Sequence, residues 1–181
     1  LDIKKVGHAG TLDPMATGVL VLGVGIATRL LTYITEGKKA YEARIKLGSA
    51  THTDDKDGDV ISSATSEQIA SVNDEMISKE LAKFVGTIKQ RPSSVSAIKI
   101  EGKSAHTRVR AGEIVEIPER DVTIDEIVIK EIRHKVDAIE VDVSVTCSAG
   151  TYIRAIARDL GERLKIGGHL ISLRRTLVSP F

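Results

Sequence analysis

The sequence predicts an α+β domain in which helices pack on one central mixed, mostly antiparallel sheet. Residues 138–147 alternate between apolar and polar side chains, which is typical of a half-buried strand in an antiparallel sheet. Residues 151–164 instead repeat apolar side chains at helical spacing, namely Ile153, Ile156, Ala157, Leu160 and Leu164. The order of the remaining strands and helices along the chain favours the same fold class.

Shorter patterns predict the elements of the first part of the chain. A nearly continuous apolar run at residues 19–24 predicts a buried strand. Helical spacing over residues 27–35, ended by Gly37, predicts a helix. Residues 41–47 alternate and predict another strand, whereas residues 51–59 are polar and acidic and predict a loop.

The later elements are predicted in the same way. Residues 66–85 predict a helix broken near Asn73, whose second part places apolar side chains on one face: Ile77, Leu81, Phe84 and Val85. Further strands are predicted at residues 95–100 and 122–132, and one more begins at 170–173. Because no repeat or low-complexity linker interrupts the chain, we expect a single domain over residues 1–181.

Composition places the chain among ordinary globular proteins, with 41% hydrophobic and 28% charged residues. No apolar run is long enough to span a membrane, and no signal-peptide pattern is present. The single cysteine, Cys147, excludes an internal disulfide and a zinc site built on several cysteines, and it fits a reducing cytoplasm. The chain opens on Leu1 rather than Met, so we expect an N-terminal segment to be missing.

Charge is distributed unevenly although the net charge is only +1. Residues 1–50 carry seven Lys or Arg against four Asp or Glu, and residues 149–181 carry six against two. The middle, 51–148, is acidic. If the two ends meet in space, they form a basic face that attracts phosphates; scattered solvated side chains are the alternative.

The most informative stretch is residues 7–18, which read GHAGTLDPMATG. Gly7 and Gly10 allow a sharp turn and a close approach to a ligand, and Pro14 biases Asp13 toward an extended conformation. A carboxylate fixed on such a loop suits a nucleophile or a general base. The alternative is a local turn in which Asp13 only caps backbone amides.

Two arginines lie one turn apart in the predicted late helix. Arg154 falls in the first turn and Arg158 follows it, so both project from one face. Because a cation at a helix N-terminus opposes the helix dipole, Arg154 is expected to have a carboxylate or phosphate partner. A bidentate pair with Asp13 would orient that carboxylate. A tolerated surface arginine is the alternative.

The acidic stretch at residues 53–58 resembles a calcium-binding loop in composition. Setting Gly58 at the sixth position of an EF-hand puts Thr53 first and Ala64 twelfth, which are poor ligands. We therefore interpret the loop as a solvated Asp/Gly turn and predict no metal site.

Aromatic residues are scarce, which argues against a module that reads single strands by rows of stacked rings. Tyr41 follows the basic Lys38 and Lys39 at the start of a strand, where a base could stack; filling the core is the alternative. His8 has no partner at metal-ligand spacing, and we expect it to brace the glycine loop by a hydrogen bond.

Taken together, these strings resemble the TruB-type tRNA pseudouridine synthases over almost the whole chain. The match rests on residues 7–20 (GHAGTLDPMATGVL), 39–48, 90–103, 147–154 and 173–175. The resemblance implies an α+β pseudouridine-synthase-like catalytic domain without cofactor or metal. It also implies that the family's N-terminal strand region is missing and that no C-terminal PUA-like domain follows Phe181.

The resemblance implies a role for each site residue. Asp13 is the catalytic nucleophile, Arg154 pairs with it, and Tyr41 stacks on the flipped base near its C5 proton. Substrate-binding residues are expected to be His8 beside the flipped nucleotide, Leu173 closing the pocket, and the basic Lys39, Arg158 and Arg174.

The implied reaction is the isomerisation of uridine-55 to pseudouridine in the T-loop of tRNA. Asp13 could attack C1′, add to C6, or assist a glycal route by proton removal, and the sequence does not choose among them. The expected partner is the tRNA T stem-loop, with no membrane and no obligate protein partner, and we expect a cytoplasmic monomer. The alternatives are a guide-RNA-dependent synthase of the archaeal and eukaryotic type and a non-catalytic tRNA-binding or folding module.

Overall fold

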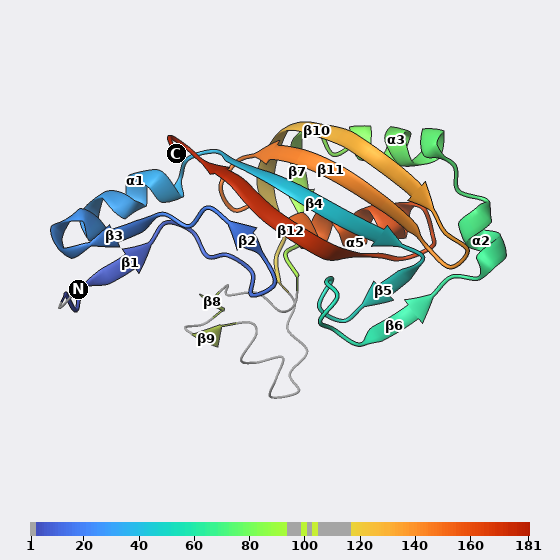
Figure 1. The fold of residues 1–181 in the computed structure, drawn as a ribbon, viewed down its shortest axis with the longest axis horizontal. Coiled ribbons are helices and arrows are strands. Elements are labelled where there is room, and N and C mark those ends of the chain that lie inside the picture. Colours follow the sequence, from blue (N-terminus) through green and yellow to red (C-terminus); the bar gives the residue numbers. More distant parts are fainter. Residues whose placement is uncertain (1–2, 94–98, 101–102, 105–116) are drawn as a thin grey trace.

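The computed structural model describes residues 3–93, 99–100, 103–104 and 117–181. Its centre is a six-stranded sheet in the order β2–β12–β4–β11–β10–β7 (Figure 1). Every neighbouring pair is antiparallel except β2 and β12, which confirms the predicted mixed, mostly antiparallel sheet. The strands are β2 (Thr17–Gly18), β4 (Lys39–Leu47), β7 (Gly86–Gln90), β10 (Arg120–His134), β11 (Ile139–Cys147) and β12 (Gly168–Val178).

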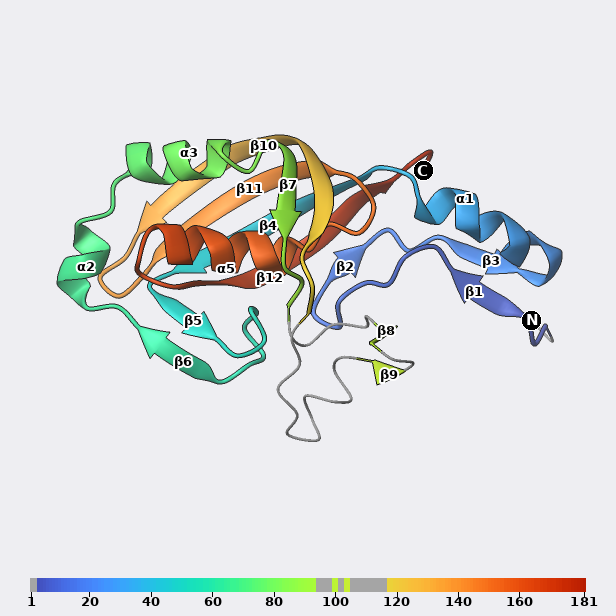
Figure 2. The ribbon, with the colours of Figure 1, turned by 180° about the vertical axis from the view of Figure 1, so that it is seen from behind.

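Helices cover one face of this sheet, as Figures 1 and 2 show from opposite sides. They are α3 (Asp74–Ala82) and α5 (Ile153–Arg163), whereas α2 (Ser66–Ala70) lies beyond one end of the sheet. The predicted break between α2 and α3 is confirmed, because the Asn73 side chain accepts a hydrogen bond from the Met76 amide and caps α3. Val85 departs from the prediction, since it follows the end of α3 and is 45% exposed.

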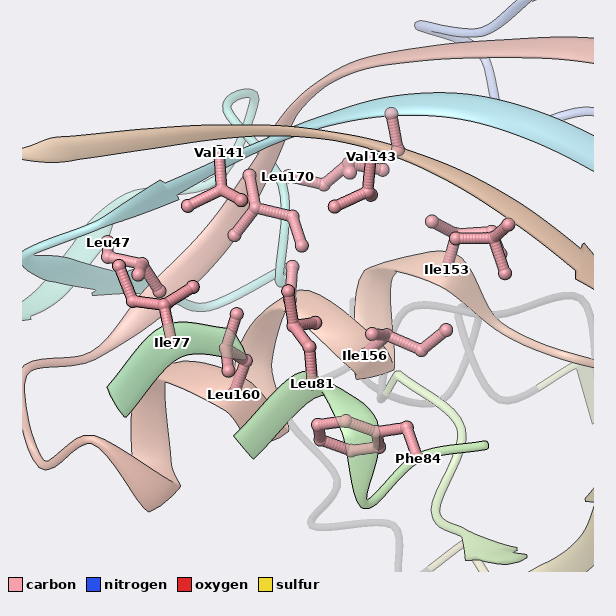
Figure 3. Packing of buried hydrophobic residues seen from close by; sticks show 14 of the residues in the cluster. Leu47, Ile77, Leu81, Phe84, Val141, Val143, Ile153, Ile156, Leu160 and Leu170 are labelled. Carbon is pink, nitrogen blue, oxygen red and sulfur yellow. The ribbon is translucent and has the colours of Figure 1, made fainter. Parts of the chain in front are cut away.

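The core lies between the helices and the sheet (Figure 3). The alternation predicted for residues 138–147 is confirmed: the apolar side chains of β11 are fully buried, and the polar ones face the other side. On that other side Asp142 accepts hydrogen bonds from Arg44 and Arg133 of the neighbouring strands. Burial of the apolar face is the main source of stability here, at about 25 cal/mol per Å² removed from water.

Close contact between α5 and β12 fixes the helix on the sheet. A Cβ on Gly161 would lie 2.1 Å from the backbone nitrogen of Gly168, a distance that no side chain tolerates. Glycine at both positions therefore lets the two backbones touch. This contact fixes the C-terminal end of α5 against the first residue of β12.

The N-terminal part forms a separate small unit that protrudes beside the sheet (Figure 1). It contains β1 (Val6–His8), β3 (Leu22–Val24), a 3-10 helix (Gly25–Leu30) and α1 (Leu31–Thr35). The prediction of a buried strand at residues 19–24 is wrong, because Leu20 and Leu22 are 42% and 58% exposed. The two-stranded ribbon of β1 and β3 lies off the main sheet, and Leu31 packs closely against Gly23 on one face of it.

Two further ribbons complete the described chain. β5 (Ser49–Thr51) pairs with β6 (Val60–Ser63), and β8 (Lys99–Ile100) pairs with β9 (Lys103–Ser104). The strand predicted at residues 95–100 falls mostly outside the described residues. Among the helices that are described, none has the length and apolar character needed to cross a membrane.

The burial of Cys147 leads to a chemical prediction. Burial raises the pKa of its thiol to about 11, and the side chain is fully buried at the end of β11. About one thiol in a thousand is therefore a thiolate at pH 8. We expect iodoacetamide to leave the native chain unlabelled at pH 8 and to label it rapidly in denaturant, as mass spectrometry would show. Equal labelling rates in the two states would contradict this placement.

Candidate active site

The loop between β1 and β2 carries Asp13 and is tied to β12. The Val19 amide donates to the Arg175 carbonyl at 2.9 Å, and Gly18 pairs with Arg175 in the sheet. Gly18 has a φ of 101°, and a Cβ there would lie 2.0 Å from the Arg175 carbonyl oxygen. Only glycine fits this position, so the end of the GHAGTLDPMATG string anchors the loop to the sheet.

Asp13 and Arg154 form the bidentate pair predicted from the sequence. Arg154 donates from Nε to Oδ2 at 3.0 Å and from Nη2 to Oδ1 at 2.9 Å. The Arg154 side chain is 6% exposed, whereas that of Asp13 is 27% exposed. The arginine is thus a buried support, and the carboxylate that it orients still reaches the surface of the site.

A second carboxylate, that of Asp55, binds the Arg154 nitrogen that does not contact Asp13. This nitrogen, Nη1, donates to Asp55 Oδ2 and to the Thr53 carbonyl, both at 3.1 Å. Asp55 in turn accepts hydrogen bonds from the Thr53 hydroxyl and the Asp57 amide. Arg154 therefore bridges two carboxylates, one buried and one at the site.

The interpretation of residues 53–58 as a solvated turn is wrong. Asp54 and Asp55 are only 7% and 6% exposed. Asp54 accepts a hydrogen bond from Arg158 at 3.0 Å, and burial raises its pKa while Arg158 opposes that shift. The loop folds inward because the two arginines on one face of α5 each require a carboxylate. Within the described residues, no group of His, Cys, Asp and Glu side chains could hold a metal ion.

Gln90 fixes the start of α5. Its side-chain amide donates to the Tyr152 carbonyl at 3.0 Å and accepts from the Tyr152 amide at 2.8 Å. The side chain is 1% exposed, so these bonds do not compete with water. Gln90 ends β7, and through this double hydrogen bond the sheet sets the position of the first turn that carries Arg154.

Tyr41 lies beside two buried cations. It sits in β4 opposite Arg175 of β12, and burial raises the pKa of its phenol, while a hydrogen bond with Arg175 opposes the shift. Lys39 donates to the carbonyls of Thr35 and Gly37. Burial, and then the charge of Arg175, lowers the pKa of Lys39. Neither Lys39 nor Arg175 has a carboxylate partner among the ion pairs of the described residues.

These side chains surround a pocket of about 300 Å³. Of the predicted site residues, Asp13, Lys39, Tyr41, Arg154 and Leu173 line it. The charged lining residues are one carboxylate, Asp13, and three cations, Lys39, Arg154 and Arg175, so the pocket is suited to an anionic ligand.

Three predicted substrate-binding residues lie elsewhere. His8 is exposed in β1 opposite Leu22, and Arg174 is exposed on β12. Arg158 binds Asp54, Asp159 and the Arg91 carbonyl beside the pocket rather than within it. None of the three is among the lining residues.

Sequence reasoning missed Arg175, Asp55 and Gln90. Arg175 is 1% exposed, and it donates to the carbonyls of Gly10, Thr11 and Val19 in the Asp13 loop. The signal for Arg175 was present, because a strand that buries Leu173 also buries the residue two positions on. The burial of Asp55 had no such local signal.

Comparison with known proteins shows the family of this chain. The sequence model of the TruB family pseudouridylate synthases (N-terminal domain) matches residues 1–153. The chain belongs to the TruB family. It is 58% identical over 178 residues to tRNA pseudouridine synthase B of Corynebacterium diphtheriae, covering 98% of this chain and 59% of that protein. A protein of the same name from Arthrobacter is 55% identical over 180 residues, covering 98% of this chain and 58% of the relative. The chain thus spans a little under three fifths of the length of these TruB relatives.

Solved structures share the fold. A Cbf5–Nop10–Gar1 complex contains a chain with a TM-score of 0.69 and 29% identity, covering 99% of this chain and 42% of that one. An H/ACA ribonucleoprotein bound to a substrate RNA containing 2′-deoxyuridine gives a TM-score of 0.67 at 26% identity, covering 99% and 40%. The predicted α+β fold of this TruB family member is confirmed.

Adjacent arginines on β12 provide a matched test of the Arg175 contacts. We expect Arg175→Met to lower the free energy of unfolding by about 3 kcal/mol, because three loop carbonyls lose a buried donor. Arg174→Met, which changes an exposed side chain, should alter it by less than about 0.5 kcal/mol. Urea denaturation of both variants measures the difference, and similar losses would argue against the buried role of Arg175.

Proposed function

We propose that this chain carries the catalytic centre of an enzyme that isomerises uridine to pseudouridine in the T-loop of tRNA, with Asp13 as the nucleophile. The observation that supports it is the Asp13–Arg154–Asp55 arrangement, in which a buried guanidinium holds one accessible carboxylate in a fixed orientation. The names of the 58% and 55% identical relatives point to the same reaction.

The reaction breaks the bond between C1′ and N1 and forms a bond between C1′ and C5. C5 then loses its proton and N1 gains one, so that substrate and product are isomers. Attack of Asp13 on C1′, its addition to C6, and proton removal on a glycal route all need an ionised carboxylate beside the sugar and the base. The bidentate contact with Arg154 keeps both carboxylate oxygens of Asp13 in a fixed orientation.

Tyr41 and Leu173 provide the walls for the base. Burial raises the pKa of the Tyr41 phenol, so the ring stays neutral at physiological pH and can stack on uracil while its hydroxyl lies near the C5 proton. Leu173 lines the same pocket as an apolar contact. A pocket of about 300 Å³ suits one nucleotide rather than a base pair, so the uridine must leave its stack, at a cost of about a few kcal/mol.

An RNA substrate fits the charge of the site. Lys39 and Arg175 line the pocket, and within the described part of the chain their partners are carbonyls and a phenol, so a phosphate backbone would supply the missing negative charge. We expect the chain to act without an obligate protein partner, as a monomer in the cytoplasm. The guide-RNA-dependent alternative is less favoured, since identity to the Cbf5 chain is 29% against 58% for the tRNA pseudouridine synthase B sequence.

Removing the Asp13 charge tests the proposed chemistry. We expect Asp13→Asn to abolish tritium release from a T-loop hairpin carrying 5-tritiated uridine, because the amide can neither attack nor take a proton. Hairpin affinity should be retained, because the pocket cations remain. Full turnover by the variant would refute the nucleophile assignment, whereas binding without turnover by the unaltered chain would favour the non-catalytic module.

Lysine substitutions at the two arginines of α5 test whether activity depends on the orientation of Asp13 or only on a nearby positive charge. Arg154→Lys keeps the charge but cannot form the bidentate pair, so we expect kcat to fall by about 100-fold with little change in KM. Arg158→Lys, whose contacts are to Asp54 and Asp159, should lose less than about tenfold. Tritium-release kinetics measures both, and equal losses would contradict a specific role for the Asp13 pair.

A further inference from the structure

Arg175 joins the two ends of the loop that carries Asp13. Its Nη1 and Nη2 donate to the carbonyls of Thr11 and Gly10, which precede Asp13, at 3.4 and 3.2 Å. Its Nε donates to the Val19 carbonyl, which follows Asp13, at 2.8 Å. Because a guanidinium is a planar and rigid fork, these three bonds fix the width of the loop at its base.

The same guanidinium reaches Tyr41 on the neighbouring strand. Arg175 and Tyr41 are paired across β12 and β4, and the guanidinium donates a hydrogen bond to the phenol oxygen. A guanidinium carries donors only, so the phenol oxygen accepts and its own proton is directed away from Arg175. Both side chains line the same pocket as Asp13. Arg175 thus contacts the loop of the proposed nucleophile and the ring proposed to stack on the base.

The backbone of β12 is shaped at this position. Its register against β4 shifts between Arg175 and Leu177, which leaves Thr176 as an extra residue on β12. Such a bulge increases the local twist and changes the direction of the neighbouring side chains. Arg175 is 1% exposed, so water does not compete for its hydrogen bonds. The guanidinium is therefore held at one place between the loop and Tyr41.

We propose that Arg175 is a positioning residue for the chemical step, which holds the Asp13 loop and the Tyr41 hydroxyl at a fixed separation so that both meet the same flipped nucleotide. This inference rests on the proposed function, because that reaction requires the carboxylate and the ring to act on one uridine. A displacement of about 1 Å in a catalytic group can cost about 100-fold in rate. Loss of the guanidinium should therefore slow the chemistry, whereas RNA binding is retained as long as a positive charge remains.

Lysine at this position tests the inference, because it keeps the charge but cannot reach both ends of the loop and the phenol at once. We expect Arg175→Lys to lower kcat for tritium release by about 30-fold or more, with KM changing by less than about threefold. Arg44→Lys is the matched control, because Arg44 also makes a two-nitrogen contact from β4, with Asp142, on the opposite face of the sheet. Its kcat should stay within about twofold of the unaltered chain.

A double-mutant cycle with Tyr41→Phe separates positioning from support of the fold. If Arg175 acts through the Tyr41 hydroxyl, Arg175→Lys should cost at least about threefold less in kcat in the Tyr41→Phe background than in the unaltered chain. Arg44→Lys should have the same effect in both backgrounds. A purely structural defect would lower kcat by the same factor in both.

A measurement on Tyr41→Phe alone does not depend on the stability of an Arg175 variant. The Leu20 amide shares its peptide group with the Val19 carbonyl, which accepts from Arg175. We expect Tyr41→Phe to shift the Leu20 signal in a proton–nitrogen NMR spectrum, because the guanidinium links the hydroxyl to that carbonyl. Tyr33→Phe, which changes a ring that is 78% exposed, is the control and should leave the signal in place.

Several results would overturn the inference. Equal kcat losses for Arg175→Lys and Arg44→Lys, additive losses in the cycle, or an unshifted Leu20 signal would leave Arg175 a structural role only. A raised KM with unchanged kcat would make it a binding residue for the RNA instead. If the unaltered chain releases tritium while any of these holds, only the inference on Arg175 fails. If the unaltered chain releases none, the proposed function fails, and the positioning role fails with it.

Discussion

A buried guanidinium determines how the site of this TruB family member is built. Arg154 at the start of α5 is almost wholly removed from water, and a cation in that position is stable only with carboxylates around it. Asp55 meets it from the loop after β5, and Asp13 meets it from the loop before β2. One side chain thereby ties together three segments that are far apart in the sequence. The same bonds leave Asp13 oriented and still accessible.

The sheet supplies the precision that this arrangement needs. β12 pairs with β4 and β2, so Arg175, Tyr41 and Gly18 lie in register across three strands. Arg175 donates hydrogen bonds to three backbone carbonyls of the Asp13 loop. Gln90, in the strand at the far edge of the same sheet, holds the first turn of α5 through its two hydrogen bonds with Tyr152. Side chains placed on strands move little, which is what a reaction sensitive to small displacements requires.

Charge is the second organising feature. The described pocket collects cations whose partners are mainly backbone carbonyls, together with the single carboxylate that does the proposed chemistry. Buried cations without carboxylate partners lower the stability of the free chain, and binding of an anion offsets that loss. Arg154 offsets the negative charge of Asp13 locally, so the RNA substrate proposed above would not be repelled from the loop.

Elements whose patterns are local could be predicted from the sequence. Alternation identified β11, helical spacing identified α5, and the GHAGTLDPMATG string identified the loop, because strand and helix periods and glycine angles depend on neighbouring residues alone. Which polar groups are buried depends instead on contacts between distant parts of the chain. Asp54 and Asp55 look solvated in the sequence and are drawn inward by Arg158 and Arg154, about a hundred residues away. The apolar run at residues 19–24 reads as core, yet its strand lies on a ribbon off the main sheet. Burial depends on what packs against a segment, and long-range packing leaves no periodic mark in the chain.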